Sequence, residues 1–293
     1  MNCHAVPNSL QPIYLNSYEH IKIRGDTKIS LNLCTLASGS KGNAIYVEAG
    51  KTKVLVDAGL SGRETRRRLQ SIDVHAEDLD AVIVSHEHTD HIQGLKVLSN
   101  QLNLPVYINY PTLSNMKGPG IKGDVREFDT GGAFSLQDLF FQSFSVPHDA
   151  ADPVGFTIEY KEVKIGIATD LGFPTRLVTE RLKKCDLLIL ESNHDEEMLK
   201  LGPYPWEVKQ RIKSRLGHLS NHQAETLIKE VYHAGLRHVI LFHLSEINNS
   251  PQKAGEGISL LLKNPGYHPI SLSLAVQHTV GKMVSLTHEN KWI

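Results

Sequence analysis

Five short apolar runs in this 293-residue chain each lead directly into a His, Asp or Glu. The runs and the residues that follow them are 81–85 before His86, 139–147 before His148, 164–169 before Asp170, 186–190 before Glu191, and 238–242 before His243. Short apolar runs bounded by turns are typical of buried strands, and ligands bind open α/β sheets at the carboxyl ends of their strands. The pattern therefore predicts an α/β fold in which these strand ends converge on a single site.

The domain organisation follows from where the apolar pattern begins. Residues 1–28 are polar, contain Pro7 and Pro12 and lack periodicity, so we expect a loosely ordered extension. From residue 29 to residue 293, short apolar runs alternate with turns and amphipathic segments, as in sheets covered by helices. The sequence thus predicts one α/β domain over 29–293.

Two amphipathic helices have clear start signals. Ser61 and Glu64 have capping-box spacing before TRRRLQ. In SNHQAETLIKEVYHAG, apolar residues recur at helical spacing from Ala224 to Val231, and Gly235 is expected to end the helix. Each helix is expected to pack one face against a sheet.

Charge and cysteine usage exclude several classes of protein. The 31 Lys and Arg balance 32 Asp and Glu to a net charge of −1, so polyanion binding has to be local. Cys3, Cys34 and Cys185 are odd in number and far apart, which argues against a disulfide framework and fits a reducing compartment. No apolar run suits a signal peptide or a membrane span. We therefore expect a cytoplasmic protein with no membrane partner; its oligomeric state is not predicted.

The segment SHEHTDHIQGL carries four potential metal ligands within six residues: His86, His88, Asp90 and His91. Imidazole nitrogens and carboxylate oxygens suit zinc, manganese or iron. Positions 86 and 88 lie on the same side of an extended segment, whereas 90 and 91 follow a turn and can reach a second ion. The segment thus predicts a two-metal site in preference to a polar loop with histidines present by chance.

HEHTDH resembles the HxHxDH motif of the metallo-β-lactamase fold hydrolases, and Asp57 in KVLVDAG looks like the early Asp of that superfamily. The resemblance covers residues 29–293 and implies a four-layer αββα sandwich with the metals at one edge. It also implies two divalent ions, Zn²⁺ or Mn²⁺, held by seven side chains: His86, His88 and His148 on the first ion, Asp90, His91 and His243 on the second, and Asp170 between them.

Longer stretches resemble the YycJ/WalJ group of nuclease-like proteins within that superfamily. They include ASGSKGNAIYVE, VPHDAADPVGF and LESNHDEEMLKLGPYPWEVKQRI. This resemblance implies a metal-dependent phosphodiesterase that degrades DNA as an exonuclease. Its partner would be a nucleic acid.

A second likeness concerns GHLSNHQAETLIKEVYHAGLRHVILFHLS, which is similar to the GHST-containing helix and final strand of tRNase Z. It implies that His218 is a general acid for the leaving oxygen and that Glu191 orients it, rather than two residues that merely flank a helix and a strand. The imidazole pKa suits this task. Only 21 residues separate His148 from Asp170, too few for a tRNA-gripping arm. Processing of tRNA is therefore not expected.

The implied mechanism uses two close cations to lower the pKa of a water, with Asp90 orienting the resulting hydroxide and His218 assisting departure of the alcohol. The alternative is a small-substrate metallo-hydrolase of the same fold, acting on a cyclic phosphodiester, thioester or lactam, because the same ions can polarise a carbonyl. The Glu191 and His218 pair favours the phosphodiesterase, since an alkoxide leaving group needs a proton more than a thiolate does.

Candidate substrate contacts lie in two loops and two basic groups. Ser40 and Asn43 lie in a glycine-containing loop that suits either a phosphate or an ordinary hairpin. Asn193 and His194 follow Glu191 closely enough to enter the site, or are surface-loop residues. Two basic groups could contact DNA phosphates or form solvated helix faces: Arg63, Arg66, Arg67 and Arg68, and Lys209, Arg211, Lys213 and Arg215.

Overall fold

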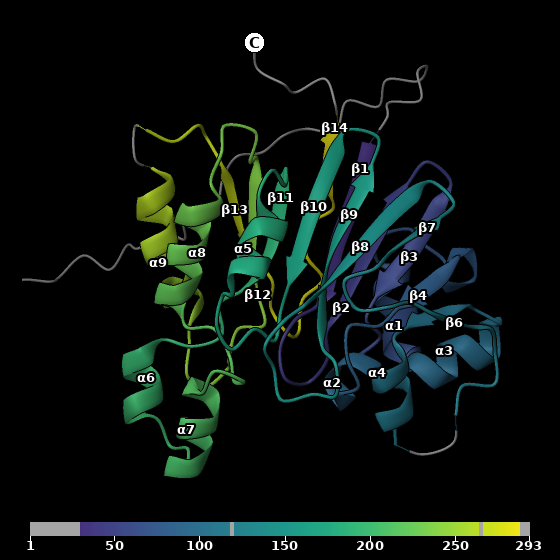
Figure 1. Ribbon diagram of the computed structural model, residues 1–293, viewed down its shortest axis with the longest axis horizontal. Coiled ribbons are helices and arrows are strands. Elements are labelled where there is room, and N and C mark those ends of the chain that lie inside the picture. Colours follow the sequence, from purple (N-terminus) through teal and green to yellow (C-terminus); the bar gives the residue numbers. More distant parts are fainter. Residues whose placement is uncertain (1–29, 118–119, 264–265, 288–293) are drawn as a thin grey trace, which may run out of the picture.

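Two seven-stranded sheets pack face to face in the computed structural model, which describes residues 30–117, 120–263 and 266–287 (Figure 1). In spatial order the first sheet consists of β14 (Val284–Thr287), β1 (Ser30–Ala37), β2 (Ala44–Ala49), β3 (Thr52–Val56), β4 (Ala81–Ile83), β5 (Val106–Ile108) and β6 (Val125–Glu127). The second consists of β13 (Ser271–Leu274), β12 (His238–Phe242), β11 (Leu187–Glu191), β10 (Val163–Ala168), β9 (Val154–Tyr160), β8 (Leu139–Ser145) and β7 (Ala133–Leu136). The predicted extension over 1–28 lies outside the described residues.

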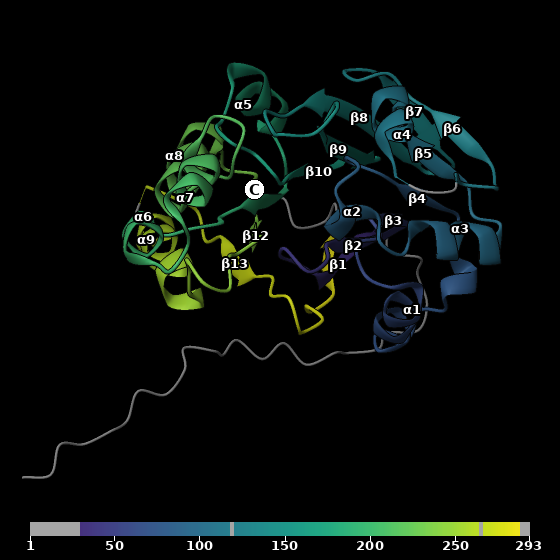
Figure 2. The same ribbon diagram turned by 90° about the horizontal axis from the view of Figure 1, so that it is seen from below.

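Helices cover the outer faces of both sheets (Figure 2). Beside the first sheet lie α1 (Gly62–Gln70), a short 3₁₀ helix (Ala76–Asp78), α2 (Thr89–Ile92), α3 (Leu95–Leu102) and α4 (Tyr110–Asn115). On the side of the second sheet are α5 (Arg176–Leu182), α6 (Glu196–Leu201), α7 (Trp206–Lys213), α8 (Asn221–Val231) and α9 (Pro251–Leu262). In the described ranges, every helix falls short of the length and apolarity that a bilayer crossing needs.

Three apolar clusters hold these layers together. The central cluster lies between the sheets, where Val47 and Ile83 of the first sheet pack with Phe141 and Phe156 of the second. The second packs α5, α8 and α9 against β8, β10, β11 and β12. The third packs α1 and α3 against the strands from β1 through β5. The order helix, sheet, sheet, helix confirms the predicted four-layer αββα sandwich.

The five predicted strands are β4, β8, β10, β11 and β12. Strands β10, β11 and β12 are parallel, and β8 runs in the same direction as β10 because both are antiparallel to β9. Where β4 ends, the backbone N–H of Val154 donates to the carbonyl of Ser85 at 3.1 Å and joins the two sheets. The carboxyl ends of all five strands therefore meet at one edge, as predicted.

Both expected helices form, but the second ends early. Ser61 Oγ accepts a hydrogen bond from Glu64 N at the start of α1, and Ser220 caps α8. Helix α8 ends at Val231, four residues before Gly235, and Tyr232 leaves the helical conformation with a ψ of 138°. This turn lets His233 Nε2 reach the carbonyl oxygen of Cys185 at 3.0 Å, so a tertiary hydrogen bond replaces the last helical turn.

Candidate metal centre

All seven predicted ligands lie together at the edge where the five strands end. His86 and His88 occupy the loop after β4, and Asp90 and His91 lie on α2. The loops after β8, β10 and β12 supply His148, Asp170 and His243. Donor atoms lie within 4.8 Å of one another in four groups: His86, His88 and His148; Asp170, Glu191, His218 and His243; Asp90, His91 and His243; and His86, His91 and Asp170. The first and third of these groups have the same members as the two predicted ligand sets.

Backbone carbonyls orient two of the imidazoles. His88 Nε2 lies 3.2 Å from the carbonyl oxygen of Asp149, and His148 Nδ1 lies 3.1 Å from that of Gly217. A carbonyl can only accept, so these ring nitrogens carry the protons. The opposite nitrogens, His148 Nε2 and His88 Nδ1, are left with lone pairs and lie 3.3 Å apart. Fixing the tautomer in this way is how proteins prepare histidines to bind a metal.

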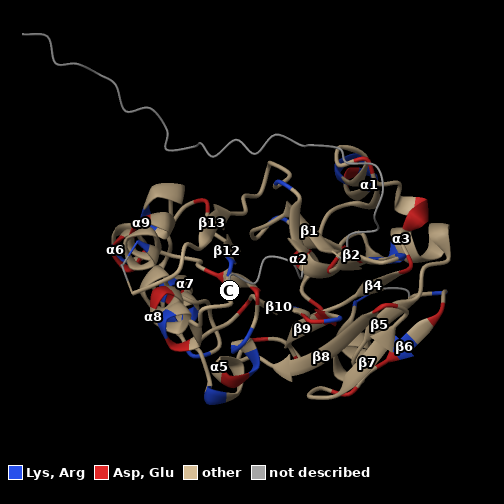
Figure 3. Cartoon of the chain, turned by 90° about the horizontal axis from the view of Figure 1, so that it is seen from above, with Lys and Arg blue, Asp and Glu red and all other residues tan. Residues whose placement is uncertain are grey.

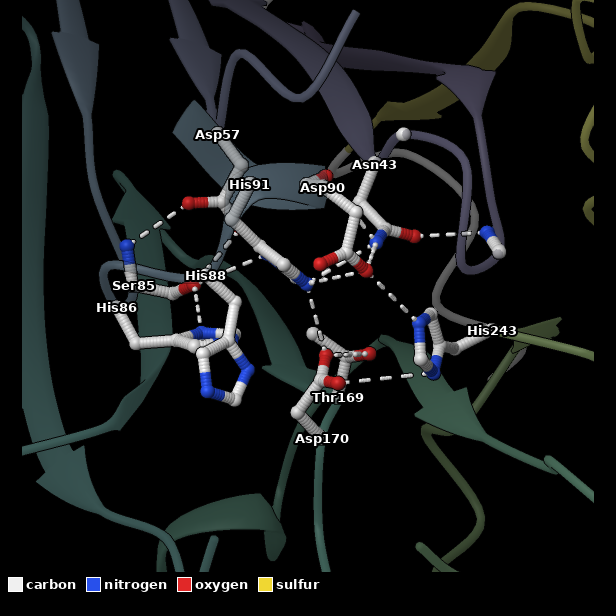
Figure 4. A network of polar contacts seen from close by, with 12 residues as sticks. Asn43, Asp57, Ser85, His86, His88, Asp90, His91, Thr169, Asp170 and His243 are labelled. Atoms are coloured by element: carbon white, nitrogen blue, oxygen red, sulfur yellow. Dashed lines mark hydrogen bonds and ion pairs between the residues drawn. The ribbon is translucent and has the colours of Figure 1, made fainter. Parts of the chain in front are cut away.

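The buried carboxylate of Asp57 orients the histidines that follow β4 (Figure 4). It accepts hydrogen bonds from the backbone N–H of Ser85, from Ser85 Oγ and from His91 Nδ1, each at 2.8 Å. Ser85 Oγ in turn lies 3.0 Å from His86 Nδ1. The remaining nitrogen, His86 Nε2, is buried and has no hydrogen-bond partner. A bare lone pair at this depth fits a metal ligand, because an unsatisfied buried acceptor is costly.

The pKa values of His86 and His91 are driven apart by their neighbours. Burial lowers both, but Asp170 and Asp57 raise the pKa of His91 well above its ordinary value of 6.5. The pKa of His86 stays well below 6.5, because burial is reinforced by the adjacent His91. The carboxylates beside His91 thus favour positive charge at this position.

His243 is surrounded by the carboxylates of Asp90, Asp170 and Glu191. Although burial opposes its charged form, these groups raise the pKa of His243 to about 10. His243 Nε2 is buried without a hydrogen-bond partner, like His86 Nε2. Imidazole nitrogens set among three carboxylates form a donor set that suits divalent metals.

Three residues that follow strands at this edge have left-handed backbones. Asp57, Asp170 and His243 have φ values of 62°, 52° and 56°. This conformation is rare for residues other than glycine and costs roughly 1–3 kcal/mol each. It turns the side chain back toward the centre at the end of each strand. The fold therefore stores strain where donor atoms must converge.

Glu191 and His218 lie beside the ligands. His218 Nδ1 is 2.7 Å from Glu191 Oε1, and the His218 ring centroid is 5.1 Å from those of His148 and His243. Glu191 is buried, which opposes ionisation, but His218 and the hydrogen bond from His243 lower its pKa to about 2. An ionised carboxylate only accepts, so His218 Nδ1 is the donor and Nε2 faces away from Glu191.

A model of the beta-lactamase superfamily domain matches residues 52–244. The chain belongs to this superfamily. It is 37% identical over 242 residues to exodeoxyribonuclease YycJ from Bacillus anthracis, covering 82% of this chain and 92% of that protein. It is also 37% identical over 234 residues to exodeoxyribonuclease WalJ from Streptococcus pneumoniae, covering 78% and 87%. The resemblance to the YycJ/WalJ group is confirmed.

Two solved structures share the fold at lower identity. The metallo-β-lactamase fold protein YhfI from Bacillus subtilis superposes with a TM-score of 0.67 at 17% identity, over 88% of this chain and all of YhfI (100%). Human tRNase Z, short form, has a TM-score of 0.57 at 17% identity, over 86% and 98%. At such identities the likeness shows the fold alone.

The four predicted substrate contacts lie on two sides of the candidate metal centre. Asn43 is buried, and its Nδ2 lies 3.0 Å from His91 Nε2 and 3.2 Å from Asp90 Oδ2. Asn43 can donate to the carboxylate of Asp90 and so supports this predicted ligand. Ser40 is exposed on the neighbouring loop. Substrate contact by either residue stays a prediction.

Asn193 and His194 form part of the wall behind the centre. Asn193 is buried and donates from Nδ2 to the carbonyl of His243 at 2.9 Å. His194 is also buried, and its Nδ1 has no hydrogen-bond partner. Burial lowers the pKa of His194 to about 4. Their contact with substrate also stays a prediction.

Two supporting residues were not singled out from the sequence. The backbone carbonyl of Asp149 accepts a hydrogen bond from His88 Nε2 at 3.2 Å. Its carboxylate accepts one from Arg211 Nε at 2.6 Å. Ser85 links Asp57 to His86. Each is adjacent in sequence to a predicted ligand, and this adjacency was the one signal available.

Proposed function

We propose that this chain is a metal-dependent phosphodiesterase that hydrolyses nucleic acid, and specifically a DNA exonuclease. The observation that carries the proposal is the Glu191 and His218 pair, held at 2.7 Å beside the predicted ligands. The names of the relatives YycJ and WalJ, which match most of this chain, support it. The site residues, and not the fold, decide the class of reaction, because one fold serves many reactions.

Two divalent ions bound by the seven ligands, Zn²⁺ or Mn²⁺, would supply Lewis acidity and neutralise the charge on the phosphodiester. Asp90 suits the task of orienting the attacking water, because 22% of its side-chain surface is exposed against 3% for Asp170. Asn43 Nδ2 holds the Asp90 carboxylate at 3.2 Å. Asp90 thus stays both fixed and accessible.

His218 is assigned to proton delivery at the leaving oxygen. Glu191 holds Nδ1 of His218, so Nε2 can carry the proton that the departing alkoxide needs. The His218 side chain is 22% exposed, which lets a substrate reach it. A thioester releases a thiolate that leaves without this help, so the pair favours a phosphodiester. The expected cytoplasmic location stays a prediction.

The test is degradation of end-labelled single- and double-stranded DNA by metal-free protein supplied with Mn²⁺ or Zn²⁺. We expect release of mononucleotides or short oligonucleotides from one end from the earliest times, and none without metal. Internal cuts would indicate an endonuclease. Intact DNA in the presence of either metal would favour the small-substrate hydrolase over our proposal.

A further inference from the structure

Helix α7 stands apart from the packed body of the protein. None of its eight residues is buried, and Trp206 at its start is 69% exposed. Figure 1 places α6 and α7 at the same end of the molecule as α2, which carries ligands. A helix with no buried face gains little from packing and calls for a partner.

The chain leaves α7 directly for the metal centre. His218 N donates to the carbonyl of Ile212 at 2.9 Å, so the turn that places His218 is built on the last turn of α7. The carbonyl of Gly217, in the same turn, orients His148. Whatever binds α7 therefore lies beside the reacting groups.

This segment is the most basic stretch near the centre. Residues 208–216 carry four cations and no acid, in a chain of net charge −1. Arg211 binds Asp149, next to His148, and the Arg215 guanidinium lies 4.0 Å from the ring centroid of Phe173, in the loop after β10. In the described part of the chain, neither Lys213 nor Arg215 has a carboxylate partner. Their charges are available to an anion.

The basic group on α1 is more fully paired. Arg66 pairs with Glu77, and Arg67 and Arg68 pair with Glu64, which leaves Arg63 as its one cation without a carboxylate partner among the described residues. Helix α1 also lies on the opposite side of the molecule from α7 (Figures 1 and 3). Of the two groups that the sequence left equal, the structure favours the cations of 209–215 as phosphate contacts.

We propose that α7 and the turn to His218 hold the DNA strand next to the nucleotide being cleaved, an inference that rests on the proposed function. Lys213 and Arg215 contact its phosphates, and Trp206 stacks on a base farther from the centre. At about 1.5 Å per residue, Trp206 and Lys213 are roughly 10 Å apart along α7, which spans about three stacked nucleotides. Exposed aromatic rings beside cations are a common way to bind single strands.

The first test compares Lys213→Gln/Arg215→Gln with Lys51→Gln/Lys161→Gln, which removes the same charge from exposed positions in the β2–β3 and β9–β10 turns. Each protein is assayed with DNA and with bis-p-nitrophenyl phosphate, which is too short to reach α7. We expect the ratio of kcat/KM for DNA to that for the small ester to fall about tenfold or more in the first variant only. Its salt dependence should also weaken, by about 0.7–0.9 in log–log slope per lost contact.

The second test uses Trp206→Ala and Trp206→Phe. The Ala variant should lower the same ratio several-fold, and the Phe variant should retain it because stacking survives. If the wild type degrades DNA but the Lys213, Arg215 and Trp206 variants keep its ratio of kcat/KM values, the inference is overturned and the proposed function stands. Variants that lose self-association but keep this ratio would overturn it in the same way. Failure of the wild type to degrade DNA would instead overturn the proposed function.

Discussion

Replacing Asp170 with Ala is expected to slow DNA degradation about a thousandfold or more and to leave the chain folded. Asp170 joins the two ligand sets: Oδ2 lies 3.1 Å from His91 Nε2, and Oδ1 lies 3.6 Å from His148 Nε2. Its loss removes the negative charge shared by both sets. Metal-assisted catalysis supplies several kcal/mol, and each 1.36 kcal/mol is about a tenfold change in rate. Single-turnover degradation of end-labelled DNA measures the loss, and circular dichroism checks the fold.

His88→Ala should behave in the same way, because His88 Nδ1 faces His148 Nε2. The matched control is His238→Ala, which removes an imidazole at the opposite end of β12, where Nε2 bonds Ser273 Oγ. Full activity of the Asp170 and His88 variants after stripping and reloading of metal would count against the assigned ligands.

Replacing His218 with Ala is expected to slow the cleavage of DNA by roughly 10²–10⁴-fold, the range of general acid–base catalysis. Its Nδ1 is fixed by Glu191, so the variant loses a proton donor already aimed at the reacting group. A nitrophenolate leaves without a proton, so hydrolysis of bis-p-nitrophenyl phosphate should fall much less. The measurement is kcat for both substrates at saturating metal.

His222→Ala is the matched control, because His222 is exposed on α8. It should leave both rates near those of the wild type. An equal loss on the two substrates in His218→Ala would remove the general-acid role and leave His218 as a residue that shapes the site.

Local features of the sequence were sufficient to predict the strands and to place the candidate ligands at their ends. Apolar runs of the length of β4 and β10 need a buried position, and HEHTDH concentrates donors directly after one of them. What orients these donors is not local. The hydrogen bond from His148 to the carbonyl of Gly217 spans 69 positions, and any residue offers a carbonyl, so no pattern marks it.

The sequence also could not separate features that differ only in their tertiary partners. Arg66 and Lys213 both look like solvated cations of a helix, but Arg66 meets Glu77 from another element, and Lys213 meets no carboxylate in the described ranges. The left-handed backbone of Asp170 is likewise set by the convergence of strands. Such features depend on where the chain returns, which single-sequence patterns do not specify.

The proposed enzyme cuts DNA with a pair of cations held by one set of side chains. The most direct measurement is a titration of metal-free protein with Mn²⁺, with bound metal and DNA degradation followed in the same samples. We predict two ions per chain, and activity that appears as they bind. DNA degradation at full rate by metal-free protein, or a chain that binds no Mn²⁺ or Zn²⁺, would contradict it.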